Sequence, residues 1–165
     1  SPIELTPDDT MDDVLIKIGE ANFLEATRLD KLRPEQNIKL TNPGRYRLLL
    51  ENIAVHKYLK EIECDCEIPY EEAVISWYDN VYMPLVQEIR ERSILERFPG
   101  RTEADLYAWL ILHRAALEEA YGFGQVSTDE IMEALEEEGT TSPLRKMERA
   151  IKRKLDPDSL PPPVE

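Results

Sequence analysis

Two stretches decide the fold: YEEAVISWYDNVYMPLVQEIR at residues 70–90 and FPGRTEADLYAWLILHR at residues 98–114. Together they hold both tryptophans and four of the seven tyrosines of the chain. In each stretch the apolar residues recur at the three- and four-residue spacing of an amphipathic helix. This density of aromatic side chains on two helical segments predicts either a tightly packed core or a recognition surface.

The composition of the whole chain favours helices. Its 165 residues suffice for one compact domain, and a hydrophobic content of 42% is adequate for a packed core. The 12 prolines stand mostly at the edges of periodic segments and only 6 glycines occur, which is typical of helices with sharp ends. No run alternates as a half-buried strand does. We therefore predict an all-α fold, a compact bundle of five to six helices with a disordered C-terminal tail.

The first two helices are predicted from their starts and their apolar stripes. Thr6 and Pro7 are residue types that begin helices, and Gly19 is expected to weaken or end the first helix. The second helix is expected over residues 41–63. One of its faces carries Leu48, Val55, Leu59 and Ile62, and an adjacent face carries Tyr46, Leu49, Ile53 and His56. So wide an apolar arc predicts a central place in the fold.

Prolines, caps and glycines predict the later helices. The third is expected over residues 69–92, with a kink at Pro84, which cannot donate a backbone hydrogen bond. Thr102 begins the fourth with a capping box, and this helix runs to about residue 121. A fifth helix is expected to stop at Gly139.

The last part of the chain is predicted to carry two helices of opposite charge. We expect a helical domain over residues 1–124, an acidic and basic hairpin over 125–155, and a disordered proline-rich tail over 156–165. The basic residues considered for interaction are Arg145, Lys146, Arg149, Lys152 and Arg153. They either pair with the acidic fifth helix, in a hairpin where Ile131 and Leu135 would pack on Leu144, Met147 and Ile151, or dock on an acidic partner.

Charge and cysteine content argue against several classes of function. A net charge of −14 makes DNA binding by this chain unlikely, because phosphate neutralisation needs clustered basic residues. No apolar run approaches the ~20 residues of a membrane span, and no signal peptide is visible. Cys64 and Cys66 are predicted to be a poor disulfide pair and too few for zinc. We expect a reduced, cytoplasmic protein without metal or cofactor, and a chain that begins at Ser1 as a piece of a longer protein.

One set of residues is a candidate ligand site. Its members are His56, Trp77, Asp79, Arg101 and His113. Two histidines, an acid and an arginine before a helix N-terminus could bind an anion or move protons if they met in one pocket. Each also has a structural explanation: core histidines, a salt-bridged Asp79, an Arg101 paired with Glu96, and a Trp77 that packs between helices. Glu72 and Asp79 share a helix face, for which a solvated or salt-bridged role is again expected.

Three long motifs resemble a helical region of bacterial ParB-like proteins. They are LTNPGRYRLLLENIAVHKY (40–58), EEAVISWYDNVYMPLV (71–86) and FPGRTEADLYAW (98–109), and the similarity extends roughly over residues 5–121. In those proteins the region follows an N-terminal ParB-like nuclease domain, and they are often labelled transcriptional regulators or left uncharacterised. The nuclease domain would lie before Ser1, so its chemistry is not assigned to this chain.

The residues and the resemblance together are compatible with three functions. The leading hypothesis is a non-enzymatic helical interaction or regulatory module that forms a homo-oligomer, expected to be a dimer, or binds a protein partner. The alternative is a small-ligand-binding or catalytic domain with a His/Asp/Arg pocket, and the third is a DNA-associated transcriptional regulator. Convergence of the candidate residues on one concave pocket would favour a ligand site, whereas an exposed apolar patch elsewhere would favour interaction.

Overall fold

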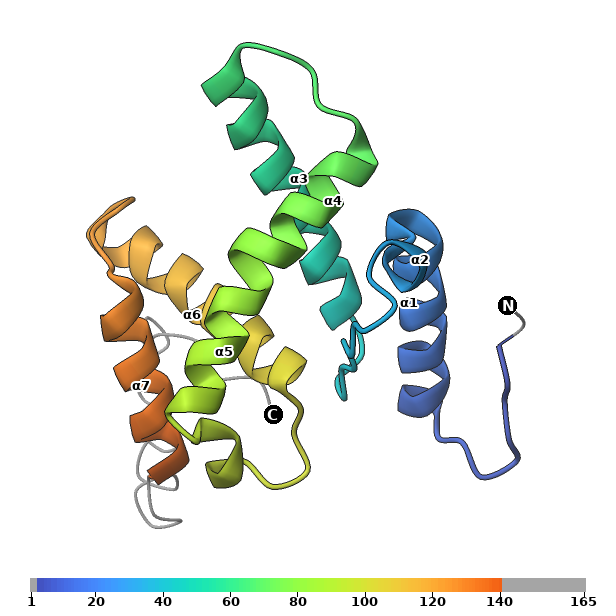
Figure 1. Cartoon of the computed structure of the whole chain (residues 1–165). Coiled ribbons are helices and arrows are strands. Elements are labelled where there is room, and N and C mark those ends of the chain that lie inside the picture. The colour runs from blue at the N-terminus through green and yellow to red at the C-terminus, as the bar shows by residue number, and fades with distance from the viewer. Residues whose placement is uncertain (1–2, 141–165) are drawn as a thin grey trace.

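The computed structural model describes residues 3–140, and within that range every regular element is helical (Figure 1). The elements are α1 (Met11–Thr27), α2 (Leu29–Leu32), α3 (Arg45–Cys64), α4 (Tyr70–Trp77), the π-helical segment η1 (Tyr78–Tyr82), α5 (Met83–Glu91), the 3-10 segment η2 (Ile94–Arg97), α6 (Glu103–Tyr121) and α7 (Thr128–Thr140). The predicted all-α class is confirmed. The predicted basic helix and the tail lie outside the described residues. Among the described helices, none combines the length and apolar character that crossing a bilayer requires.

The predicted start of the first helix is wrong by one turn. The capping pattern occurs twice, and the helix uses the second copy: the Thr10 hydroxyl accepts from the Asp13 N–H, while the Asp13 carboxylate accepts from the Thr10 N–H. This copy directly precedes the apolar stripe, whereas Thr6 forms an isolated turn with Asp9.

Gly19 does not end α1, which continues to Thr27. A Cβ atom at Gly19 would lie 3.2 Å from the ring of Tyr46 on α3. The glycine therefore serves the close approach of two helices rather than a helix end. Because α1 continues, Phe23 reaches the core and packs 5.6 Å from the Tyr46 ring, measured between centroids.

Pro84 interrupts the third predicted helix as expected. The interruption takes the form of η1, in which the Met83 N–H donates to the Tyr78 carbonyl five residues earlier. Pro84 then stands in the first turn of α5, where its missing N–H costs no hydrogen bond. The wider turn leaves both Tyr78 and Tyr82 buried, with their rings stacked at 5.7 Å.

The fourth predicted helix is confirmed at both ends. The Thr102 hydroxyl accepts from the Asp105 N–H, the Asp105 carboxylate accepts from the Thr102 N–H, and the helix ends before Gly122. Asp105 is only 3% exposed, because its carboxylate also accepts from the backbone and hydroxyl of Thr41. One side chain thus ties the start of α6 to the segment before α3.

The wide apolar arcs that carry Trp77 and Trp109 predict that both are buried in one cluster, whereas the core of the structure consists of two clusters. Trp77 lies in the first, with Phe23, Leu49 and Tyr107 among its members, and Trp109 lies in the second, with Ile89, Met132 and Leu135. Both tryptophans are buried, at 0% and 4% exposure. α6 belongs to both clusters because Tyr107 and Trp109 project from different faces of the same helix.

The acidic helix α7 packs on the main body. Ile131, Met132 and Leu135 are buried in the second cluster, so their apolar face meets α5, η2 and α6. Ion pairs add to this packing, because Arg92 at the end of α5 donates to Glu136 at 2.6 Å and to Asp129 at 3.3 Å. The predicted basic partner helix lies outside the described residues.

Gly139 lies inside α7 instead of ending it, and its lack of a side chain is needed for packing. A Cβ atom there would lie 2.7 Å from Arg97 Cβ and 2.8 Å from the ring of Phe98. We expect Gly139→Ala to lower the free energy of unfolding by about 1–3 kcal/mol through overpacking. Without this contact, the higher helix propensity of alanine would stabilise the protein by up to about 1 kcal/mol. Urea unfolding, with Glu133→Ala on the exposed side of α7 as control, distinguishes the two signs.

Candidate functional site

Two members of the predicted ligand set, His56 and Trp77, form hydrogen bonds with side chains of neighbouring helices. His56 on α3 makes a 3.0 Å hydrogen bond with the Ser76 hydroxyl on α4, and burial lowers the pKa of His56, with Lys60 acting in the same direction. The Trp77 indole N–H donates to Asn52 Oδ1 at 2.7 Å, and the same oxygen accepts from the Tyr107 hydroxyl at 2.6 Å. Asn52, which sequence reasoning did not single out, therefore joins α3, α4 and α6.

The other three members of the predicted set are engaged separately. Asp79 receives two hydrogen bonds from Arg33, at 3.0 and 2.5 Å, and the Arg33 guanidinium holds the pKa of this carboxyl below its usual value. This is the salt-bridged role that we expected. Arg101 donates to Thr41 and Asn42, each at 3.1 Å, so its partners are not the predicted Glu96.

His113 stacks on Trp109 with 4.4 Å between ring centroids, and burial lowers its pKa. The five predicted residues are all within the described range, and each of them contacts a different neighbour. No group of three or more metal-ligating side chains is found within residues 3–140. Each of the five residues therefore has a structural partner of its own.

The second half of α3 carries an exposed apolar face. This docking face consists of Val55, Tyr58, Leu59 and Ile62, which are 56%, 63%, 52% and 59% exposed. The sequence predicted two apolar arcs on this helix, and only the arc with Tyr46, Leu49 and Ile53 is buried. The central position predicted for the helix thus holds for its first half.

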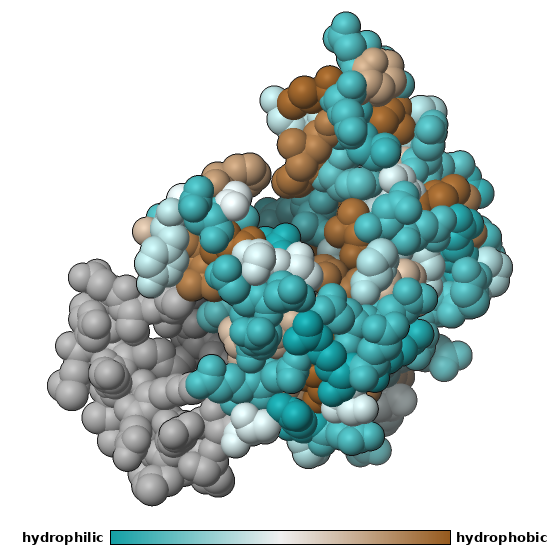
Figure 2. Space-filling view, turned by 60° about the vertical axis from the view of Figure 1, so that its left-hand side comes forward, coloured by the Kyte–Doolittle hydropathy of each residue, from teal (hydrophilic) through white to brown (hydrophobic). Residues whose placement is uncertain are grey.

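The docking face is exposed because of the position of α3 in the molecule. Its second half and the loop to α4 project from the rest of the molecule, so no other described element lies against the outer side (Figure 1). Figure 2 shows apolar side chains gathered on this projection and a hollow between it and the neighbouring part of the surface. Single exposed apolar residues are ordinary, whereas a contiguous group on one helix is a feature typical of contact sites.

Charge is distributed unevenly along α3. Arg45 and Arg47 stand in its first turn, and Arg47 lies 3.5 Å from Glu51. The end of the helix and the following loop carry the exposed acids Glu63, Asp65 and Glu67. The docking face therefore lies between a basic and an acidic end.

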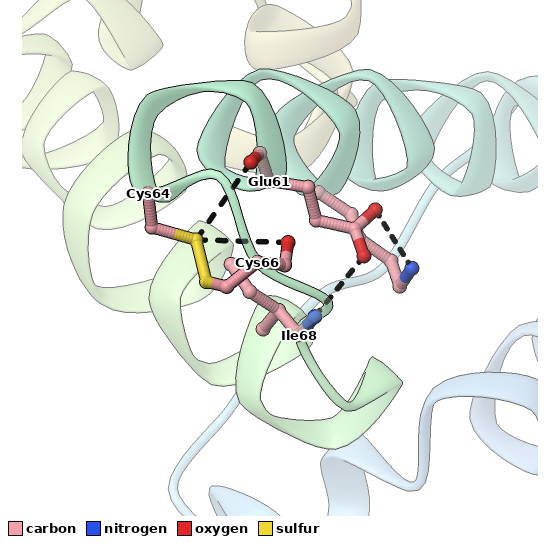
Figure 3. The surroundings of a disulfide bond; sticks show 5 residues. Glu61, Cys64, Cys66 and Ile68 are labelled. Carbon is pink, nitrogen blue, oxygen red and sulfur yellow. Dashed lines mark hydrogen bonds and ion pairs between the residues drawn. A yellow bond between two sulfur atoms is a disulfide. The ribbon is translucent and has the colours of Figure 1, made fainter.

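The tip of the projection holds a disulfide between Cys64 and Cys66, contrary to our prediction (Figure 3). Asp65 adopts a left-handed conformation with φ 51° and ψ 46°, which turns the chain back on itself. This brings the two Cα atoms to 5.2 Å, inside the range of about 4.4–6.8 Å that a disulfide requires. In an extended C-x-C segment the two Cα atoms would lie at the upper limit of this range, and the sequence does not show the turn that brings them closer.

Hydrogen bonds around Glu61 hold the same loop in place. The Cys66 N–H donates to the Glu61 carbonyl at 3.2 Å, and the Ile68 N–H donates to the Glu61 carboxylate at 3.0 Å. Lys57 also lies 3.0 Å from this carboxylate. These contacts, the Ile68 hydrogen bond above all, lower the pKa of Glu61, so the carboxylate stays ionised and keeps the loop closed.

Comparison with known protein families, with curated proteins and with solved structures finds no match to this chain. The candidate functional site is therefore defined by its own geometry: an exposed apolar helix face that ends at an exposed disulfide.

Proposed function

We propose that this chain is a non-enzymatic helical interaction module that associates with a second copy of itself through the docking face of α3. The observation that carries the proposal is the exposure of Val55, Tyr58, Leu59 and Ile62 on consecutive turns of one helix. Removing such side chains from water is favourable by about 1.5–3 kcal/mol for each one that becomes fully buried.

The spacing of these residues suits a helix as the partner element. Positions 55, 58 and 62 follow the four- and three-residue steps of a helix–helix seam, and Leu59 widens it. A helix laid along this seam reaches all four side chains, because residues three and four apart are neighbours on a helix surface. The projection of α3 leaves room for a partner along its whole second half (Figure 1).

A second copy is favoured because the face is complementary to itself. In an antiparallel pair, Val55 of one chain comes opposite Ile62 of the other, and Tyr58 comes opposite Leu59. A twofold contact of this kind uses the same residues on both chains and closes at a dimer, the commonest symmetric assembly.

The proposal extends to the context of the module. The motifs at residues 40–58, 71–86 and 98–109 support a place after a ParB-like nuclease domain in a longer bacterial protein. In that arrangement self-association would bring two nuclease domains together, which is a regulatory role without chemistry of its own.

Light scattering tests the dimer directly. We expect a mass of twice 19.1 kDa for the chain at micromolar concentration and a return toward 19.1 kDa for Leu59→Asp, whose charge would be buried in the seam. The dissociation constant should rise at least about tenfold, which corresponds to ~1.4 kcal/mol.

Two controls separate this contact from others. Phe123→Asp makes the same change at a residue that is 86% exposed after α6, and it should leave the dimer intact. Truncation after Thr140 removes the predicted basic helix and should also leave it intact, even in 1 M salt, where charges are screened beyond ~3 Å. A monomer at high concentration, or a dimer that Leu59→Asp does not weaken, would contradict the proposal.

A further inference from the structure

The Cys64–Cys66 disulfide contributes little that a structural crosslink normally contributes. It spans a separation of only two residues, and the stabilisation from a disulfide grows with the length of chain it closes. The turn that it crosses is already held by backbone and side-chain hydrogen bonds to Glu61. A bond that adds so little constraint calls for another role.

The disulfide is open to attack from solvent. Both cysteines are exposed, and they stand at the tip of the projecting helix pair rather than against the core (Figures 1 and 3). Thiol–disulfide exchange requires a thiolate to reach one sulfur atom, and exposed disulfides are the labile members of their class. Access is therefore no barrier to exchange in the folded protein.

The surroundings of the disulfide carry a net negative charge, because the four acids at residues 61, 63, 65 and 67 outnumber Lys57 and Lys60 on the preceding turns of α3. Glu63, Asp65 and Glu67 alternate with the cysteines and are all exposed. The carbonyl oxygens of Glu61 and Cys66 also lie 3.7 and 3.6 Å from Cys64 Sγ. A thiol that carries an additional negative charge is repelled here, and a thiol that carries a positive charge is attracted.

We infer that Cys64 and Cys66 form a thiol–disulfide exchange site that is reduced by neutral or positively charged thiols in preference to anionic ones. The attacking thiolate forms a bond with one cysteine sulfur as the Cys64–Cys66 bond breaks. The other cysteine leaves as a thiolate and takes a proton from water. A second thiol of the reductant then displaces the first cysteine, so two electrons and two protons reach the protein and the reductant becomes a disulfide.

The site lies beside the docking face but does not depend on it. Ile62, the last apolar residue of that face, is two residues before Cys64. Reduction removes the covalent closure across Asp65, and only hydrogen bonds then hold the turn. The part of the docking face nearest to this change is its end at Ile62. The exchange chemistry can be measured whether the protein is a monomer or a dimer.

The test uses the full oxidised chain and three small thiols of different charge. Cysteamine is cationic, 2-mercaptoethanol is neutral and 2-mercaptoethanesulfonate is anionic, and free cysteines are trapped by alkylation and counted by mass. We expect reduction without denaturant, with a rate constant per thiolate at least about tenfold larger for cysteamine than for the sulfonate at low salt. The ratio should approach unity in 1 M salt, because screening shortens to ~3 Å.

Two triple variants distinguish the effect of the local acids on the rate ratio from the effect of the overall net charge of −14. Glu63→Gln with Asp65→Asn and Glu67→Gln should reduce the rate ratio severalfold. Glu4→Gln with Glu25→Gln and Glu119→Gln changes the net charge equally at other exposed positions and should leave the ratio high. Equal ratios in the two variants would overturn the charge preference.

The double variant Cys64→Ser and Cys66→Ser tests the alternative that the disulfide serves only to stabilise the fold. We expect its melting temperature to stay within a few degrees of the wild type, since the closed loop is so short. A disulfide that is reduced only after unfolding, or a large loss of stability in the double variant, would overturn the assignment of an exchange site.

Discussion

Replacing either Trp77 or Trp109 with alanine is expected to lower the free energy of unfolding by about 3–5 kcal/mol. Trp77 is 0% exposed and its ring lies 5.3 Å from Tyr82 and 6.0 Å from Tyr107, between centroids. Trp109 is 4% exposed and fills the second cluster. Each truncation leaves a large cavity among side chains from several helices, which cannot all collapse into it.

Urea unfolding followed by circular dichroism measures both variants, and Phe123→Ala is the exposed aromatic control that should cost little. Phenylalanine variants add a sharper distinction. Trp77→Phe loses the hydrogen bond to Asn52, whereas the buried Trp109 indole N–H has no partner within residues 3–140. Trp77→Phe should therefore cost about 1 kcal/mol more than Trp109→Phe. Wild-type stability in either alanine variant would contradict the two-cluster core.

Asp105→Ala is expected to cost about 3 kcal/mol, a large effect for a residue outside the apolar core. Its carboxylate accepts from the Thr41 N–H at 2.8 Å, the Thr41 hydroxyl at 2.7 Å and the Thr102 N–H at 3.0 Å. The change removes hydrogen bonds to a charged group, each with a net value of about 1.5–3 kcal/mol, and leaves partly buried donors without an acceptor.

Two further variants divide this effect between its parts. Thr102→Ala removes the helix cap but keeps the contact with Thr41, so it should cost about 1 kcal/mol. Asp105→Asn retains one carbonyl acceptor and should fall between the two. Chemical unfolding of the three proteins gives the order, and an Asp105→Ala cost no larger than that of Thr102→Ala would show that the contact with Thr41 contributes nothing.

Local features of this chain were predictable because their physical causes lie within a few residues. The capping box of Thr102 and Asp105, the interruption at Pro84 and the end of α6 before Gly122 all follow from backbone hydrogen bonds near the residue concerned. The first helix shows the limit of this reasoning. The same cap pattern occurs at Thr6 and at Thr10, and only the second is followed directly by the apolar residues that hold a helix on the core.

The candidate site was not predictable in the same way. The two apolar arcs of α3 are equivalent in sequence, and burial of the Tyr46 arc depends on where α1, α4 and α6 pack. The surroundings of the predicted ligand set were hidden for a related reason, because His56, Asp79 and Arg101 each form hydrogen bonds with a residue distant in sequence.

The sequence by itself determined the helical class, the ends of α6 and the break before α5, since these depend on hydrogen-bond capacity and helix periodicity. Only the tertiary structure decided that Gly19 and Gly139 lie inside helices, because their role is to admit Tyr46, Arg97 and Phe98. It also decided which face of α3 remains in water, and that a turn at Asp65 brings two cysteines together. These outcomes depend on distances between segments far apart in the chain, or on the backbone conformation of a single residue. The local residue patterns used for prediction contain neither kind of information.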